Sequence, residues 1–112
     1  MSAAQESILE SVSSIITLSA EEKKYFLSTL QQKSIKRKEF LLREGEICKT
    51  ETYVASGCLR AYTVDNDGND HVLMFGVEDY WISDLYSFLT QKPATMNIDA
   101  LEDSELFQIS KA

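Results

Sequence analysis

The spacing of apolar residues changes along the chain, from a helical period to a strand period. The apolar residues near the N-terminus that recur at helical spacing are Ile8, Leu9, Val12, Ile15 and Ile16. They predict an amphipathic helix from about Ala4 to Thr17. Ser19 and Glu22 then have the spacing of a capping box, which predicts a second helix that ends near Leu30.

From Ile35 onward the pattern changes to short β-type runs. These runs are Phe40–Leu42, Thr52–Ala55, Leu59–Val64, His71–Val77, Thr95–Leu101 and Glu105–Ile109. They are separated by turn-forming residues around Gly45, at Gly57 and in the sequence DNDGND at 65–70. Short strands at near-regular spacing are typical of a sandwich or jelly roll rather than a parallel α/β sheet.

Length and charge narrow the class of protein. A chain of 112 residues predicts one domain, with a helical part over residues 1–31 followed by a β part over residues 32–112. The net charge of −7 argues against direct binding of nucleic acid or an anionic membrane. The N-terminus lacks the pattern of a signal peptide, and no apolar run approaches the roughly 20 residues of a membrane span. We therefore expect a cytoplasmic location.

Few residues suggest catalysis or metal binding. His71 is the only histidine, and Cys48 and Cys58 match no zinc or iron–sulfur spacing. They are interpreted as buried free thiols. In DNDGND, with Asp65 as the first residue, the glycine is the fourth. A calcium-binding EF-hand loop requires its glycine at the sixth position, so the sequence favours a hairpin turn. We expect no metal, no cofactor and no enzymatic activity. A small cupin-type metal enzyme remains an alternative that the single histidine disfavours.

Two long runs resemble a known family. The run GEICKTETYVASGCLRAYTVDNDGNDHVLMF, from Gly45 to Phe75, resembles the first part of the cyclic-nucleotide-binding β-roll of Crp/Fnr transcription regulators. It has a GE turn, a second glycine after ten residues and a D-G hairpin. The run from Asp79 to Ser110 is similar to the phosphate-binding cassette and closing strands of that family. The resemblance implies a mainly β double-stranded β-helix, or jelly roll, preceded by two helices.

The resemblance also implies a candidate ligand pocket. Nucleotide-binding members carry Phe-x-Gly-Glu-Leu where this chain has WISDL at residues 81–85. Asp84 stands where an acid accepts a hydrogen bond from the ribose 2′-hydroxyl, although it could instead act only as a favourable acid at a helix N-terminus. Ser83 replaces a glycine, and residues 83–85 offer free backbone N–H groups to an anion. Leu59 and Leu73 match apolar wall positions, and Leu85 completes the motif.

The far side of this cassette departs from the family pattern. Family members that bind cyclic nucleotides have an Arg-Ser or Arg-Thr pair at the positions of Ala94 and Thr95. Thr95 keeps the hydroxyl, but Ala94 supplies no charge, and Lys92 lacks the planar fork of arginine. Arg60 should point away from the pocket, because it alternates with Leu59 along a strand. The sequence thus predicts a degenerate phosphate-binding cassette that binds neither cyclic AMP nor cyclic GMP tightly.

The family places a dimerisation helix and a winged helix-turn-helix after the β-roll. The sequence ends at Lys111-Ala112, so we expect both to be absent here. We interpret the chain as the sensor domain of a regulator that is a homodimer when intact, with DNA bound only through the absent domain. It has either an unidentified small-molecule effector or none. A stand-alone interaction module on the same fold is the alternative.

Overall fold

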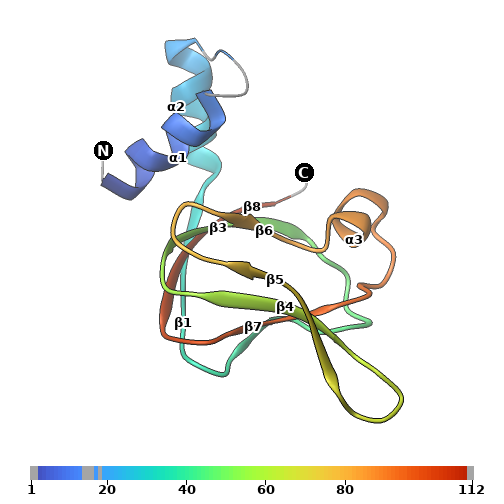
Figure 1. Ribbon diagram of the computed structural model, residues 1–112. Helices are drawn as coiled ribbons and strands as arrows, with labels where there is room; N and C mark the ends of the chain where they lie inside the picture. Colours follow the sequence, from blue (N-terminus) through green and yellow to red (C-terminus); the bar gives the residue numbers. More distant parts are fainter. Residues whose placement is uncertain (1–2, 14–16, 18, 111–112) are drawn as a thin grey trace.

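Two helices precede a roll of β-strands in the computed structural model (Figure 1), which describes residues 3–13, 17 and 19–110. Helix α1 spans Ala3–Ser13 and helix α2 spans Ala20–Thr29. The capping box is confirmed, since Glu22 N–H donates to Ser19 Oγ at 3.1 Å and Ser19 N–H donates to Glu22 Oε1 at 3.0 Å. The predicted end of the first helix, at residues 14–16, lies outside the described residues.

The β part contains eight described strands and one short helix. They are β1 Gln31–Ile35, β2 Phe40–Leu42, β3 Thr50–Ser56, β4 Leu59–Val64, β5 Asp70–Gly76, β6 Trp81–Ile82, α3 Leu85–Thr90, β7 Asn97–Ala100 and β8 Ser104–Ser110. The predicted fold class, mainly β with two N-terminal helices, is confirmed. The predicted limits of β2 and β4 are correct, and those of β3, β5, β7 and β8 differ by one or two residues at each end.

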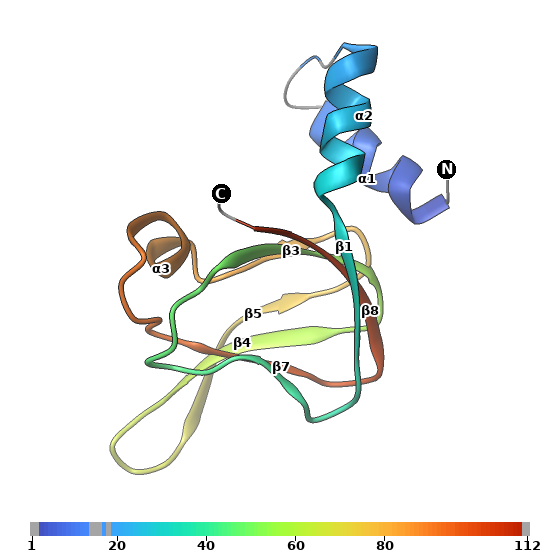
Figure 2. The ribbon, with the colours of Figure 1, turned by 180° about the vertical axis from the view of Figure 1, so that it is seen from behind.

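The strands form two four-stranded sheets that face each other (Figure 1, Figure 2). One sheet has the order β1-β8-β3-β6 and the other β2-β7-β4-β5, and the strand pairs are antiparallel. The buried core between them is made by Ile35, Leu42, Cys48, Val54, Leu59, Ala61, Ile82, Ala94, Ile98, Ala100 and Leu106. In β4 and β7 the core residues alternate, Leu59 with Ala61 and Ile98 with Ala100, as the period of two predicts, whereas β5 supplies none of the core residues.

The N-terminal helices attach to the outer side of the first sheet. Trp81 Nε1 donates to Ser11 Oγ at 3.3 Å, and the Trp81 ring lies edge-on to Tyr53, with 5.2 Å between ring centroids. The Tyr53 hydroxyl donates to Asp79 Oδ1 at 2.5 Å, and burial together with this acceptor raises the pKa of Tyr53. Ile8 of α1 is fully buried. None of the described helices is both long and apolar enough to span a membrane.

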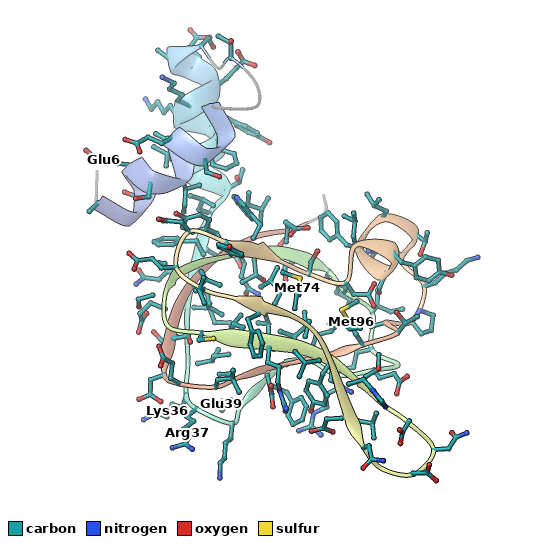
Figure 3. All side chains as sticks on the ribbon, viewed as in Figure 1. Glu6, Lys36, Arg37, Glu39, Met74 and Met96 are labelled. Carbon is teal, nitrogen blue, oxygen red and sulfur yellow. The ribbon has the colours of Figure 1, made fainter. Side chains whose placement is uncertain are left out.

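The turns agree with the sequence interpretation. Between β4 and β5, Asp65 accepts from the N–H groups of Asp67 and Asn69, both at 2.9 Å, which is the predicted hairpin. Between β1 and β2, Lys36 and Arg37 project away from the roll (Figure 3). Both side chains are exposed to solvent.

Both cysteines are free, but only one of them is buried. Cys48 is 5% exposed, and burial raises the pKa of its thiol. Cys58 is only partly buried. Within the described part of the chain, no three His, Cys, Asp or Glu side chains are grouped so that they could hold a metal ion.

Gly57 is the position at which the β3–β4 turn depends on glycine. Its φ is +100°, and a Cβ placed there would lie 2.1 Å from Ser104 Oγ. Gly57→Ala should therefore lower the free energy of unfolding by about 2–5 kcal/mol, from backbone strain and steric overlap together. Urea unfolding of the variant measures this loss.

Gly68 is the matched control for Gly57. Its φ is +84°, but no atom lies within 4 Å of the Cβ position. Gly68→Ala should cost only the backbone strain, about 1–2 kcal/mol. Equal losses in the two variants would show that the contact with Ser104 does not restrict Gly57.

Candidate functional site

The segment between β6 and β7, residues 83–96, forms the candidate site and is named the cassette here. It contains α3, which lies beside the open end of the roll (Figure 1). Helix α3 ends at Gln91, which adopts the left-handed conformation with φ 58°. The Gln91 amide donates to the carbonyls of Cys48 and Phe88 at 3.0 and 2.8 Å. The end of α3 is thus attached to the segment before β3.

Asp84 organises the start of the cassette. It is the N-cap of α3 and only 1% exposed. Oδ1 accepts from Ser87 N–H at 3.1 Å, while Oδ2 accepts from Thr95 N–H at 2.7 Å and from Thr95 Oγ1 at 3.2 Å. The carboxylate thus joins the beginning of α3 to the chain that leads into β7. Both of its oxygens are engaged by groups of the cassette itself.

Ser87 is a cassette residue that the sequence interpretation missed. It is fully buried, accepts from Cys48 N–H at 2.8 Å and donates to the Lys92 carbonyl at 2.6 Å. A serine inside a short helix is a weak sequence signal, because serine side chains commonly bond to nearby backbone. Its partner Cys48 is 39 residues away, and no local pattern predicts that contact.

Six of the seven predicted site residues divide into three groups in the structure, and the seventh, Ser83, is described below. Asp84 and Thr95 are in direct contact, as described above. Leu59 and Ala94, at 0% and 4% exposure, belong to the buried core. Leu85 and Leu73 are 58% and 55% exposed. Leu73 lies on the edge strand β5, at a step where the pairing with β4 shifts register.

Arg60 lies outside the pocket, as the strand alternation predicts. Its guanidinium donates to both carboxylate oxygens of Asp99, at 3.1 and 2.9 Å, and to Asp70 at 3.3 Å. It also stacks on the Tyr62 ring, with Cζ 3.9 Å from the ring centroid. The neighbouring Leu59 faces the core. Arg60 therefore supplies no charge to the cassette.

Ser83 has an acidic partner. Its hydroxyl donates to Glu51 Oε2 at 2.7 Å. Burial raises the pKa of the Glu51 carboxyl, and the hydrogen bond from Ser83 opposes that rise. An acid therefore lies next to the residue that replaces the family's glycine.

Comparisons with known proteins agree with this geometry. Residues 32–112, well over half of the chain, match the family described as cyclic nucleotide-binding domain. The fold and the cassette thus define a β-roll domain of the kind that senses small ligands. The chain belongs to the cyclic nucleotide-binding domain family, whose members are typically regulatory and non-catalytic. No curated protein sequence matches the chain significantly.

Solved structures resemble the chain at the level of the fold. The sensor domain of the transcriptional regulator DNR from Pseudomonas aeruginosa has a TM-score of 0.79 and 20% identity, with 95% of this chain and 73% of that chain covered. The regulatory domain of Toxoplasma gondii PKA with cAMP has a TM-score of 0.82 and 17% identity, with 98% and 42% covered.

A third structure carries a different ligand. The regulatory subunit of a cAMP-independent protein kinase A from Trypanosoma cruzi, bound to guanosine, has a TM-score of 0.76 and 15% identity, with 96% and 38% covered. This chain therefore spans less than half of either kinase subunit. Transcription regulators and kinase regulatory subunits are comparably close in fold.

Asp84→Asn tests the role of the carboxylate. Asparagine keeps one oxygen but places an NH₂ group where the second oxygen accepts from Thr95. We expect the free energy of unfolding to fall by about 1–3 kcal/mol, because the buried side chain at position 84 would then present a donor where the Thr95 groups need an acceptor. Urea unfolding is compared with Asp67→Asn, a change of equal charge at the exposed hairpin. A loss no larger than that of the control would contradict the role given to Asp84.

Glu51→Gln tests the half-buried acid beside Ser83. In the folded protein the pKa of Glu51 lies above its ordinary value of 4.5, so folding favours the protonated form. The stability that goes with this preference for protonated Glu51 is fully present below pH 4.5. It is lost as the pH rises through the pKa that Glu51 has in the folded protein. Relative to wild type, Glu51→Gln should therefore gain stability at pH 7 but not at pH 4, as measured by urea unfolding. Glu44→Gln, at an exposed turn, is the control, and a gain at both pH values would exclude this explanation.

Proposed function

We propose that this chain is the effector-sensing regulatory domain of a Crp/Fnr-like transcription regulator, and that its cassette does not hold a cyclic nucleotide. The resemblance of residues 45–75 and 79–110 to that family supports the assignment, as does the similarity to the sensor domain of DNR. A cytoplasmic location and a dimeric intact protein follow from this role. DNA would be bound through a separate domain.

The carboxylate of Asp84 is the observation that supports loss of the nucleotide. It accepts from the backbone N–H and the hydroxyl of Thr95, which stand at the position of the family's phosphate-binding serine or threonine. A cyclic phosphate would need those same donors. It would also be placed next to a buried negative charge, which disfavours a second anion. Cyclic nucleotide binding would therefore require Asp84 to leave its present partners.

Ala94 removes the other half of the phosphate clamp. Its side chain is 4% exposed within the core, and its backbone bonds to Gly45 and Glu46. No guanidinium is available there. A charge-assisted hydrogen bond contributes roughly 1.5–3 kcal/mol, so its absence corresponds to about a ten- to hundredfold loss of affinity. Lys92 is exposed and compensates poorly.

In the proposed mechanism, an effector shifts the balance between two arrangements of the domain. An effector can change that balance only through a difference in its affinity for the two states. The cassette is a suitable moving part, because the side chains of Ser87 and Gln91 attach it to Cys48, while Asp84 joins its two ends to each other. A ligand that replaces any of these contacts would change the position of α3.

A nucleoside without a phosphate is the second candidate ligand class. The cassette lacks the charge for phosphate, and Leu59, at the family's apolar wall position, is buried in the core. The Trypanosoma cruzi protein described above has this fold and was solved with guanosine. A neutral nucleoside would not be repelled by the Asp84 carboxylate.

Calorimetric titration with cyclic AMP, cyclic GMP and guanosine tests both candidates. For the unmodified chain we expect no cyclic nucleotide affinity at or below about 10 μM, which corresponds to roughly −7 kcal/mol. Ala94→Arg should strengthen cyclic AMP binding by about 1.5–3 kcal/mol if the missing charge is the main deficit.

The control is Ala94→Gln, which adds length without charge at the same position. Circular dichroism and thermal unfolding establish that both variants are folded. Tight cyclic AMP binding by the unmodified chain would refute the degenerate cassette. Saturable binding of guanosine alone would favour the nucleoside candidate.

A further inference from the structure

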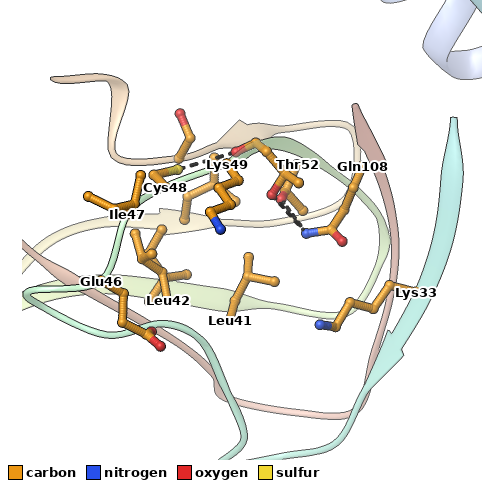
Figure 4. Close-up of a pocket in the computed structure, with 13 residues that line it drawn as sticks. Lys33, Leu41, Leu42, Glu46, Ile47, Cys48, Lys49, Thr52 and Gln108 are labelled. Carbon is orange, nitrogen blue, oxygen red and sulfur yellow. Dashed lines mark hydrogen bonds between the residues drawn. The ribbon is translucent and has the colours of Figure 1, made fainter. Parts of the chain in front are cut away.

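A cavity lies between the two sheets of the roll. It opens between the edge strands β1 and β2 and has a volume of about 390 Å³ (Figure 4). Ligand pockets in proteins typically have volumes of about 300–1,000 Å³. Of the cassette residues only Ser83 lines it, and Asp84, Ala94 and Thr95 do not. This cavity therefore lies beside the cassette and shares only Ser83 with it.

The floor of the cavity is apolar. Leu42, Ile82 and Ile98 line it, and their side chains are 7%, 1% and 1% exposed. They come from β2, β6 and β7, so both sheets contribute. A ligand reaching this floor would have to carry a compact apolar group.

One wall of the cavity is polar and neutral. The Gln108 amide donates to Thr50 Oγ1 at 3.1 Å and to Thr52 Oγ1 at 3.2 Å. A threonine hydroxyl that accepts a hydrogen bond retains its own hydrogen for donation. The wall can thus donate to an acceptor group of a ligand.

Two lysines provide positive charge at the mouth. Lys33 of β1 and Lys49, which precedes β3, extend their ammonium groups into the cavity from two directions (Figure 4). Glu46 also lines the cavity, but its carboxylate accepts from Arg43 N–H at 2.7 Å. Two cations and one acid give a local positive charge on a chain whose net charge is −7. This local reversal of charge favours an anionic ligand.

We propose that this cavity binds a small organic anion, namely a carboxylate attached to a compact apolar group. The carboxylate lies between Lys33 and Lys49, where the threonine hydroxyls also face it, and the apolar part covers Ile82 and Ile98. The proposal does not depend on what the cassette binds. It assigns a ligand class to a site that the cyclic nucleotide comparison does not address.

The test uses hexanoate as the probe and two-dimensional ¹H–¹⁵N NMR of the whole chain as the readout. Saturable shifts should appear at Lys33, Lys49, Thr52 and Gln108. Acetate should bind at least about tenfold more weakly, because it lacks the methylene groups that cover the apolar floor. Hexanamide, of equal size but neutral, should also bind more weakly than hexanoate.

Lysine variants isolate the charge. Lys33→Gln and Lys49→Gln should each weaken hexanoate binding by about two- to fivefold, a size appropriate to solvent-exposed charges. Lys36→Gln, on the exposed β1–β2 turn outside the cavity, is the control with the same loss of charge. It should leave the affinity unchanged. The NMR spectra of the variants also establish that each is folded.

Three results would overturn the proposal. One is the absence of saturable shifts at the cavity residues up to about 20 mM hexanoate, where even a millimolar site would be filled. Another is that hexanamide binds as tightly as hexanoate, or that Lys36→Gln weakens hexanoate binding as much as the two cavity variants do. Either would show that the effect of charge is non-specific. The third is a set of shifts confined to residues 84–95, which would place the ligand in the cassette. Results of the cyclic nucleotide titration leave each of these outcomes unchanged.

Discussion

The buried carboxylate of Asp84 is the interaction on which the cassette depends. A charge removed from water is tolerated only when hydrogen bonds replace its hydration, and Asp84 receives three of them. Two come from Thr95, eleven residues further along the chain. Helix α3 has only six residues, which is too short for a stable isolated helix. Its position therefore comes from this carboxylate and from the contacts of Ser87 and Gln91.

That arrangement determines which ligands the cassette can accept. Where a bound phosphate could have supplied the negative charge for the donors of Thr95, the chain supplies its own through Asp84. An anionic ligand would therefore have to displace the Asp84 carboxylate from the donors of Thr95, because those donors already have an acceptor. Substituting arginine for Ala94 would add attraction for phosphate, but it would leave this competition in place. The affinity of this cassette for phosphate is thus lowered by two separate features, which are the lack of a cation at Ala94 and the presence of the Asp84 carboxylate.

The sequence predicted the elements that have strong local patterns. The limits of β2 and β4 could be read from their apolar runs, and the second helix from its capping box. Strand β1 was missed because the first four residues of its sequence, QQKSI, are polar and exposed, as suits an edge strand. Strand β6 was missed because two residues show no period. Leu73 matched a family position, but on the edge strand β5 its side chain remains exposed.

Long-range contacts were the part of the site that the sequence could not supply. Asp84 was recognisable as an acid at a helix start, but nothing local indicates that Thr95 provides two of its donors. The cavity between β1 and β2 was equally hidden. Lys33 lies on β1 and Lys49 precedes β3, two strands that β8 separates within one sheet, and no local pattern predicts that both residues line one cavity.

Ile82 lies next to both the cavity and the cassette. Its side chain forms part of the cavity floor and also packs against β5, where a Cβ on Gly76 would lie 3.1 Å from Ile82 Cδ1. In sequence it stands two residues before Asp84, and Ser83 between them also lines the cavity. Close-packed interiors transmit displacement because they contain little free space. A ligand that moved Ile82 would therefore also displace Asp84, the N-cap of α3.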